Sequence, residues 1–122
     1  MNAVIYCRVS TLEQTKNLSL STQRAACRAY CEGHAHRVVK EFIEAGESAK
    51  TTNRPELQRL LAFCRESKRG VQLLLVYNMS RLSRNMADHI TLRVLLGDEG
   101  VQLRSVTEPI DDSAAGMLMD NI

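Results

Sequence analysis

The stretch AVIYCRVS, residues 3–10, sets the pattern from which the rest of the chain can be interpreted. Its first half is an apolar run typical of a buried strand. Residues two apart on a strand share a face, so we expect Tyr6, Arg8 and Ser10 to project together and the residues between them to project oppositely. A guanidinium and a hydroxyl on one face, at the carboxyl end of a buried strand, therefore need an explanation.

Strand-like and helix-like segments alternate along the 122 residues. Apolar stripes, helix-capping residues and glycine stops locate the elements. We expect strands at 3–9, 37–43, 71–77 and 101–106, with loops at 11–17 and 44–53. The first helix should run from Ser19 or Ser21 to about Glu32 and stop at Gly33. The second should begin at Pro55 and close at Lys68, Arg69 and Gly70, and the third should span 86–98 and end at Gly100. This order predicts an α/β fold, with a mainly parallel sheet of four to five strands flanked by helices on both faces.

The composition is that of one globular domain, with 44% hydrophobic and 25% charged residues. No apolar run approaches the ~20 residues of a membrane helix, and no basic segment precedes the first apolar one, so we expect a cytoplasmic protein without membrane contact. The four cysteines lack C-x-x-C or zinc-ligand spacing, which indicates core residues and no metal site.

The cations are mostly arginines, which outnumber lysines twelve to four. The planar guanidinium suits phosphate and carboxylate groups. High-GC coding would also favour arginine, so both explanations stay open. The net charge of +2 does not decide between them.

The segment NMSRLSRN, residues 78–85, follows the third predicted strand. Ligands of parallel sheets bind beyond the carboxyl ends of the strands, where this segment meets Arg8 and Ser10. Arg81 and Arg84 are three apart, so they share a face on a helical turn at or near a helix N-terminus. Together these groups predict a phosphate site that contains a nucleophile. The alternative is a solvated R-x-x-R helix face and a serine that caps a turn.

No histidine stands where it could activate Ser10. His34 and His36 precede the second strand, at the opposite edge of the sheet, and His89 lies inside a helix. We interpret all three as structural or exposed. A Ser-His-Asp triad is therefore not expected, and activation of Ser10 is assigned mainly to arginines.

Four motifs together resemble the catalytic domain of the serine recombinases, the resolvase/invertase family. They are YCRVS (6–10), SLSTQR (19–24), TNRPEL (52–57) and SRLSRN (80–85), and they cover nearly the whole chain in order and spacing. The last two look most like the large transposon or phage integrase members.

The resemblance implies a mechanism. Ser10 matches the nucleophile that attacks a DNA phosphodiester and forms a 5′-phosphoserine link. Arg8, Arg81 and Arg84 match the arginines that hold the scissile phosphate, and Arg54 matches another active-site arginine. The covalent intermediate conserves the phosphodiester energy, so religation needs no cofactor, and arginines can stabilise the charge without metal.

Three further residues are assigned to substrate binding by the same resemblance. Gln23 matches a polar residue near Arg54. Ser80 occupies the place where the family commonly has an aspartate, which is a departure from its pattern. Glu44, just past the second strand, matches a position where the family often has an acid and would be the nearest carboxylate.

The domain organisation implied by the resemblance is a catalytic domain at 1–110, followed at 111–122 by the start of a long oligomerisation helix. A short helix folded back on its own domain is the alternative for that segment. The expected partners are double-stranded DNA and further copies of the protein, as a homodimer that assembles into a tetramer on DNA. The DNA-binding domain would lie outside this sequence, so residues 1–122 alone should bind DNA poorly.

Two other functions remain open. A flavodoxin-like or receiver-like domain that binds a small phosphate ligand would share the architecture, but residues 10–17 contain no glycine and no paired acids. A non-catalytic DNA-bound assembly module derived from a recombinase would keep most of this sequence, although intact Arg8, Ser10, Arg81 and Arg84 argue against decay.

Overall fold

The computed structural model describes residues 1–9, 20–45, 54–66, 70–82 and 86–108. Several predictions fall outside these residues. They concern Ser10, the loop at 11–17, Lys68 and Arg69, Arg84, and the helix expected at 111–122. The second helix ends earlier than predicted, at Arg65, because Glu66 is extended with φ −75° and ψ 105°.

The described sheet has four strands, all parallel, in the order β2-β1-β3-β4. Their bounds are Asn2–Val9 for β1, Arg37–Ala45 for β2, Leu73–Val76 for β3 and Gln102–Ser105 for β4. The N-terminal strand lies in the middle, where Tyr6 faces Phe42 on one side and Val76 on the other. The parallel α/β architecture predicted from the sequence is confirmed.

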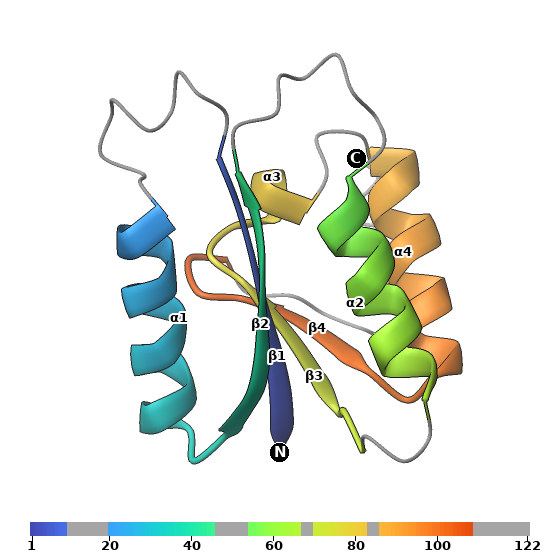
Figure 1. Cartoon of the computed structure of the whole chain (residues 1–122). Coiled ribbons are helices and arrows are strands. Elements are labelled where there is room, and N and C mark those ends of the chain that lie inside the picture. The colour runs from blue at the N-terminus through green and yellow to red at the C-terminus, as the bar shows by residue number, and fades with distance from the viewer. Residues whose placement is uncertain (10–19, 46–53, 67–69, 83–85, 109–122) are drawn as a thin grey trace.

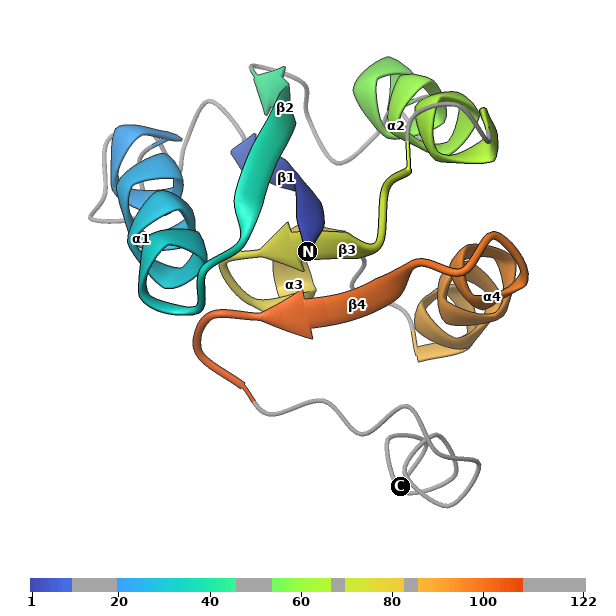
Figure 2. The same ribbon diagram turned by 90° about the horizontal axis from the view of Figure 1, so that it is seen from below.

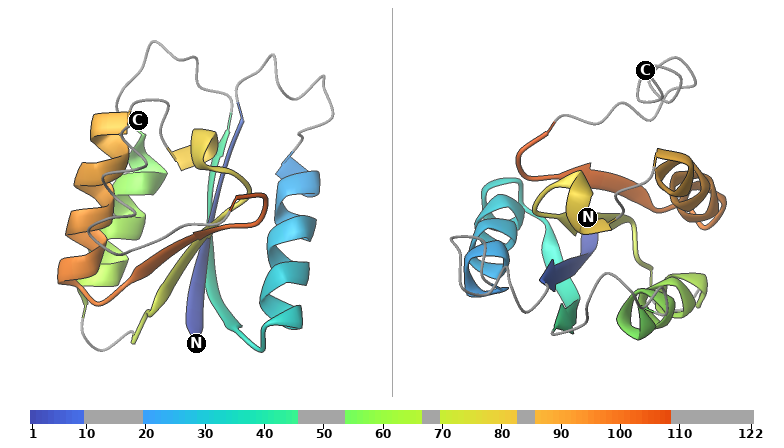
Figure 3. Two further views of the ribbon diagram at one scale, coloured as in Figure 1. Left: turned by 180° about the vertical axis from the view of Figure 1, so that it is seen from behind. Right: turned by 90° about the horizontal axis from the view of Figure 1, so that it is seen from above.

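Helices cover both faces of the sheet. Helix α1 (Leu20–Gly33) lies on one face, and α2 (Pro55–Arg65) and α4 (Met86–Asp98) lie on the other (Figures 1 and 2). A fourth helix, α3 (Met79–Leu82), packs against β1 and lies at the end of the sheet opposite the N-terminus (Figure 3). Among the described residues, every helix is too short or too polar to span a bilayer.

The core is divided by β1 into two layers. Val4 and Tyr6 are buried with α2 and α4, whereas Ile5 and Cys7 are buried with Cys27 of α1. This is the expected alternation of a strand covered on both faces. All four cysteines are buried and free, as predicted for core residues.

Strand β2 differs from its prediction in two ways. Ala3 pairs with Val38 and Val4 with Lys40, so Val39 is an extra residue in the register, with 39% of its surface exposed. The strand also extends to Ala45, so the prediction that Glu44 opens a loop was wrong. Glu44 pairs with Arg8 in the sheet, and backbone pairing with β1 carries the strand past the apolar run.

The turn after α1 also departs from the prediction. Gly33 stays within the helix, and the left-handed conformation falls on Ala35, with φ 57°. The His36 N–H donates to the Cys31 carbonyl at 2.8 Å, which satisfies a helix-end acceptor. At the end of α4, Gly100 takes the left-handed position as predicted, with φ 75°.

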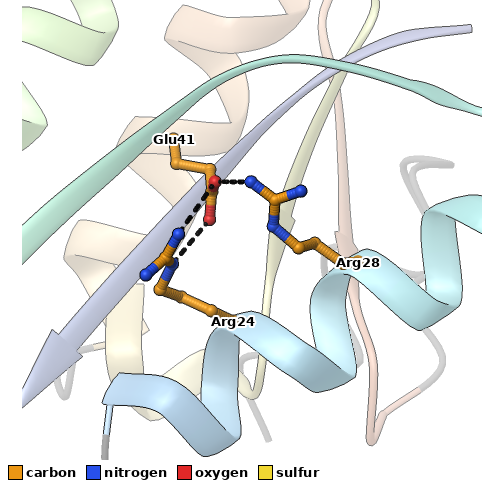
Figure 4. A network of polar contacts seen from close by, with 3 residues as sticks. All are labelled: Arg24, Arg28 and Glu41. Carbon is orange, nitrogen blue, oxygen red and sulfur yellow. Dashed lines mark hydrogen bonds and ion pairs between the residues drawn. The ribbon is translucent and has the colours of Figure 1, made fainter.

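Helix α1 is fastened to β2 by an ion cluster on the surface (Figure 4). Arg24 Nε donates to Glu41 Oε1 at 2.9 Å, and Arg28 donates to Glu41 Oε2. The two arginines hold the pKa of the Glu41 carboxyl below its usual value, chiefly through the hydrogen bond from Arg24. The cluster therefore fixes one turn of α1 over the edge strand.

Candidate functional site

Three of the predicted arginines meet at the carboxyl edge of the sheet. Arg8 is the penultimate residue of β1, Arg54 directly precedes α2, and Arg81 lies on α3. Each element brings its arginine from a different part of the chain to the same end of the sheet (Figures 1 and 3). The expectation that strand ends bring Arg8 and Arg81 together is met, and Arg54, which was assigned by the resemblance alone, joins them.

Arg8 and Arg81 bind each other's backbone. Arg8 donates from Nε to the Arg81 carbonyl at 3.0 Å and from Nη2 to the Ser80 carbonyl at 2.9 Å. Arg81 donates from Nη1 to the Arg8 carbonyl at 3.2 Å and is 6% exposed. The two side chains thus lock the end of β1 onto α3.

Arg54 joins the same cluster from a strained backbone position. Its φ of 34° and ψ of 65° are left-handed, which costs an L-residue about 1–2 kcal/mol. Its guanidinium donates to the Tyr6 hydroxyl at 3.0 and 3.3 Å and to the Arg81 carbonyl at 3.3 Å. Strain of this kind concentrates at functional sites, where surrounding contacts hold it.

Tyr6 was expected only to share a face with Arg8. Its ring is fully buried, and the Arg54 guanidinium carbon lies 5.4 Å from the ring centre. Burial raises the pKa of the Tyr6 hydroxyl, against the lowering effect of Arg54. The hydroxyl is therefore a neutral acceptor that holds Arg54, a role the alternation pattern did not reveal.

Gln23 lies behind the site and contacts the backbone of Arg8. Its side chain, with no exposed surface, accepts from the Arg8 N–H at 3.3 Å and donates to the Arg8 carbonyl at 3.1 Å. The amide thus continues the hydrogen-bonding pattern of β1 onto α1. This placement favours positioning of Arg8 over direct contact with a substrate.

Glu44, near the end of β2, is buried, with 5% of its surface exposed. Its Oε2 accepts from the Glu56 N–H at 2.8 Å, in the first turn of α2. Burial raises the pKa of the Glu44 carboxyl, although the Glu56 N–H and Arg54 oppose that shift. Within the described residues, Glu44 fixes the start of α2 directly after Arg54.

Ser80 is exposed, and its hydroxyl donates to Asn78 Oδ1 at 2.7 Å. It contributes its backbone carbonyl to Arg8 and adds no charge at the place where an aspartate is usual. Ser10 and Arg84 lie outside the described residues. Ser10 directly follows β1, and Arg84 comes two residues after α3.

The site also contains contacts that no sequence motif indicated. Glu108, beyond β4, accepts a hydrogen bond from Met79, the first residue of α3. His89 donates to the Met79 carbonyl, in keeping with the interpretation of His89 as a structural residue. Across the described ranges, no three His, Cys, Asp or Glu side chains gather as a metal site.

The arrangement is suited to binding a tetrahedral anion. Two guanidiniums, from Arg8 and Arg54, donate to one carbonyl oxygen, that of Arg81. A phosphate offers several charged acceptors to such forks and binds them more strongly than a neutral carbonyl does. The carbonyl therefore occupies donors that a phosphodiester could take over.

Comparisons with known proteins agree with this geometry. The family model "Resolvase, N terminal domain" matches residues 3–122. The chain is 30% identical over 115 residues to the DNA-invertase hin of Salmonella typhimurium, across 94% of this chain and 53% of that protein. It is 34% identical over 109 residues to the serine recombinase gin of Escherichia phage Mu, across 89% and 49%. The chain spans about half the length of these two relatives.

Two solved structures share the fold. A resolvase family site-specific recombinase from Streptococcus pneumoniae superposes with a TM-score of 0.86 at 29% identity, across 99% of this chain and 83% of that one. The N-terminal catalytic domain of TP901-1 integrase gives 0.81 at 29% identity, across 99% and 89%. With the family model matching nearly every residue and three arginines gathered at the end of β1, the chain belongs to the resolvase family of serine recombinases.

Proposed function

We propose that this chain is the catalytic domain of a site-specific DNA recombinase that cleaves and rejoins DNA through Ser10. The observation that carries the proposal is the convergence of Arg8, Arg54 and Arg81 at the edge where β1 leads into Ser10. The family membership and the DNA-invertase relatives support the reaction class.

In the proposed reaction, Ser10 Oγ attacks a DNA phosphorus and loses its proton. A bond forms between Oγ and phosphorus, the bond from phosphorus to the 3′ oxygen breaks, and that oxygen leaves as a protonated 3′ hydroxyl. The 5′-phosphoserine link is later attacked by a 3′ hydroxyl of the new partner strand, which regenerates Ser10. Each step exchanges one ester for another, so no external energy source is needed.

The arginines supply charge stabilisation. Arg8, Arg81 and Arg84 are assigned to the non-bridging oxygens of the phosphate, where negative charge concentrates in the transition state. Arg54 is assigned to the same cluster, held by Tyr6. Binding requires Arg8 and Arg54 to release the backbone carbonyls of α3, so the phosphate replaces an internal acceptor.

The residues proposed for substrate binding divide by exposure. Ser80 is at the surface, where its hydroxyl can contact a DNA backbone, while Gln23 and Glu44 are buried and act by positioning Arg8 and Arg54. None of these roles needs a metal or an organic cofactor.

The partners belong to the same proposal. The substrate is double-stranded DNA, and the active assembly is a homodimer that pairs into a tetramer on DNA. Residues 111–122 begin the oligomerisation helix, and sequence recognition lies outside residues 1–122. We place the protein in the cytoplasm, which fits its free cysteines because that compartment keeps thiols reduced. The likeness to TP901-1 integrase supports the large integrase type.

The test is capture of the covalent intermediate. The full-length protein is incubated with duplexes tiled across candidate site DNA, quenched with detergent, and examined for a DNA band whose mobility is restored by protease. We expect an adduct with the natural protein and none with Ser10→Ala, because the nucleophilic oxygen is removed. Circular dichroism checks that the variant is folded.

Two results would decide against the proposal. An adduct formed by Ser10→Ala would place the nucleophile elsewhere. DNA binding by the natural protein with no adduct on any duplex would favour the alternative of a non-catalytic assembly module.

A further inference from the structure

Met79, the first residue of α3, is held by both of its backbone groups. Its N–H donates to Glu108 Oε1 at 2.7 Å, and its carbonyl accepts from His89 Nε2 at 3.1 Å. Glu108 comes from the segment after β4, whereas His89 comes from α4. Two distant parts of the chain thus hold the first residue of the helix that carries Arg81.

Glu108 is brought to Met79 by an extension of the sheet. The Val106 N–H donates to the Val76 carbonyl at 3.0 Å, and the Thr107 N–H donates to the Tyr77 carbonyl at 3.2 Å. The Ser105 hydroxyl lies 3.4 Å from Glu108 Oε1. Because the chain after β4 stays paired with the chain after β3, the carboxylate reaches Met79 with little freedom to move away.

The position of Met79 matters because the two residues that follow it carry the carbonyls that accept from the arginines of the site. The Ser80 and Arg81 carbonyls take the hydrogen bonds from Arg8 and Arg54. A hydrogen bond from a backbone N–H to a carboxylate is charge-assisted, and 2.7 Å is at the short end of its range. Glu108 therefore holds α3 in register with the guanidiniums.

We propose that Glu108 is a positioning residue that ties the chain after β4 to α3 and thereby sets Arg81 against Arg8. The catalytic consequence rests on the proposed function, whereas the contact itself does not.

The contact is tested by amide hydrogen exchange at Met79, followed by NMR in the 122-residue chain. Glu108→Ala should accelerate exchange at Met79 by about tenfold, because the only described acceptor of that N–H is removed. Glu108→Gln should restore slow exchange, since its amide oxygen accepts in the same place. Glu99→Ala, which removes an exposed glutamate before β4, is the matched control and should change nothing at Met79.

The catalytic role is tested with the full-length protein on saturating candidate site DNA. Glu108→Ala should lower the rate of adduct formation about tenfold with DNA affinity unchanged within twofold, and Glu108→Gln should recover most of the rate. Because Glu108 is exposed, loss of folding is not expected; if Glu108→Ala does unfold, Glu108→Asp keeps the charge but falls short of Met79 and serves instead.

The outcomes separate the two proposals. Unchanged exchange at Met79 in a folded Glu108→Ala or Glu108→Asp variant overturns the contact. Accelerated exchange with an unchanged rate of adduct formation overturns the positioning role. Absence of any adduct with the natural protein rejects the proposed function, while the exchange data still decide whether Glu108 holds α3.

Discussion

At the scale of single residues, Tyr6 illustrates how a core side chain serves the site. Its ring belongs to the layer beneath α2 and α4, but its hydroxyl accepts two hydrogen bonds from Arg54. Those bonds help to offset the left-handed backbone at Arg54. One residue therefore contributes to packing and to the geometry of a cation in the candidate site.

Tyr6→Phe removes only the oxygen that accepts from Arg54. We expect the free energy of unfolding to fall by about 1.5–3 kcal/mol, the usual contribution of a hydrogen bond that involves a charged group. Chemical denaturation measures the change. Tyr30→Phe is the control, because the described contacts of Tyr30 are ring stacking and a backbone carbonyl, and it should change stability by less than about 0.5 kcal/mol. Equal losses in both variants would contradict the assigned role.

At the scale of elements, the turn between α1 and β2 is strained at Ala35. An alanine in the left-handed region is disfavoured by about 1–2 kcal/mol, and Gly33 does not relieve this because it lies within the helix. Ala35→Gly should therefore raise the free energy of unfolding by about 0.5–1 kcal/mol, after the greater chain entropy of glycine in the unfolded state is included.

The converse substitution is Gly100→Ala. No atom lies within 4 Å of the added methyl group, so only backbone strain enters, and we expect a loss of about 1 kcal/mol. Thermal unfolding of Ala35→Gly and Gly100→Ala measures the change in stability of each variant. A destabilised Ala35→Gly would contradict the left-handed conformation at that residue.

The cluster of Arg24, Arg28 and Glu41 makes the docking of α1 depend on pH. The pKa of Glu41 is lower in the folded state than in the unfolded chain, so its contribution is present above the unfolded pKa of about 4.3 and disappears as pH falls through the folded pKa. Glu41→Gln should lower stability by about 0.5–1 kcal/mol at pH 7 and by less at about pH 3, which lies below the unfolded pKa.

Denaturation at the two pH values checks this, with Glu32→Gln as the control on the exposed surface of α1. An equal loss at both pH values would show that Glu41 acts through packing and not through its charge.

Sequence patterns located the elements better than their ends. Gly100 marked the end of the helix at 86–98. The apolar pattern of the sequence placed all four strands, because it reports which segments are buried. It could not show that Val39 is an extra residue in β2, that Glu44 continues the strand, or that Ala35 replaces Gly33 as the left-handed residue. Those features depend on the pairing of β2 with β1 and on hydrogen bonds that form only in the folded chain.

At the scale of the whole molecule, the charges that the proposed phosphoryl transfer requires come from arginines in three parts of the chain, on β1, directly before α2 and on α3. Because these guanidiniums can stabilise the transition state themselves, we expect adduct formation by the full-length protein to continue in EDTA. The assay is the detergent-quenched capture described above, with a magnesium-dependent restriction enzyme as the control for complete chelation. Loss of the adduct in EDTA while DNA binding persists would indicate a metal-dependent reaction.

The candidate site was predictable in part. Arg8 and Arg81 were predicted to meet because both follow or end parallel strands, whose carboxyl ends lie at one edge of the sheet. The resemblance to serine recombinases added Arg54. The Glu108–Met79 contact was not predictable, because Glu108 resembles any exposed acid in a turn and becomes significant only when β4 lies beside β3. Local patterns identify the groups that carry charge, whereas the residues that position them emerge from long-range pairing.

The central place of β1 also determines the order in which the domain can assemble during synthesis. Strand β1 is translated before both of its neighbours in the sheet, β2 and β3, and β3 ends only at Val76. Until β3 has been translated, one edge of the apolar strand β1 is unpaired and accessible to chaperones and to other nascent chains. Because α3 follows β3 in the sequence, the arginines of β1 and α3 can meet only after both of those elements have been translated.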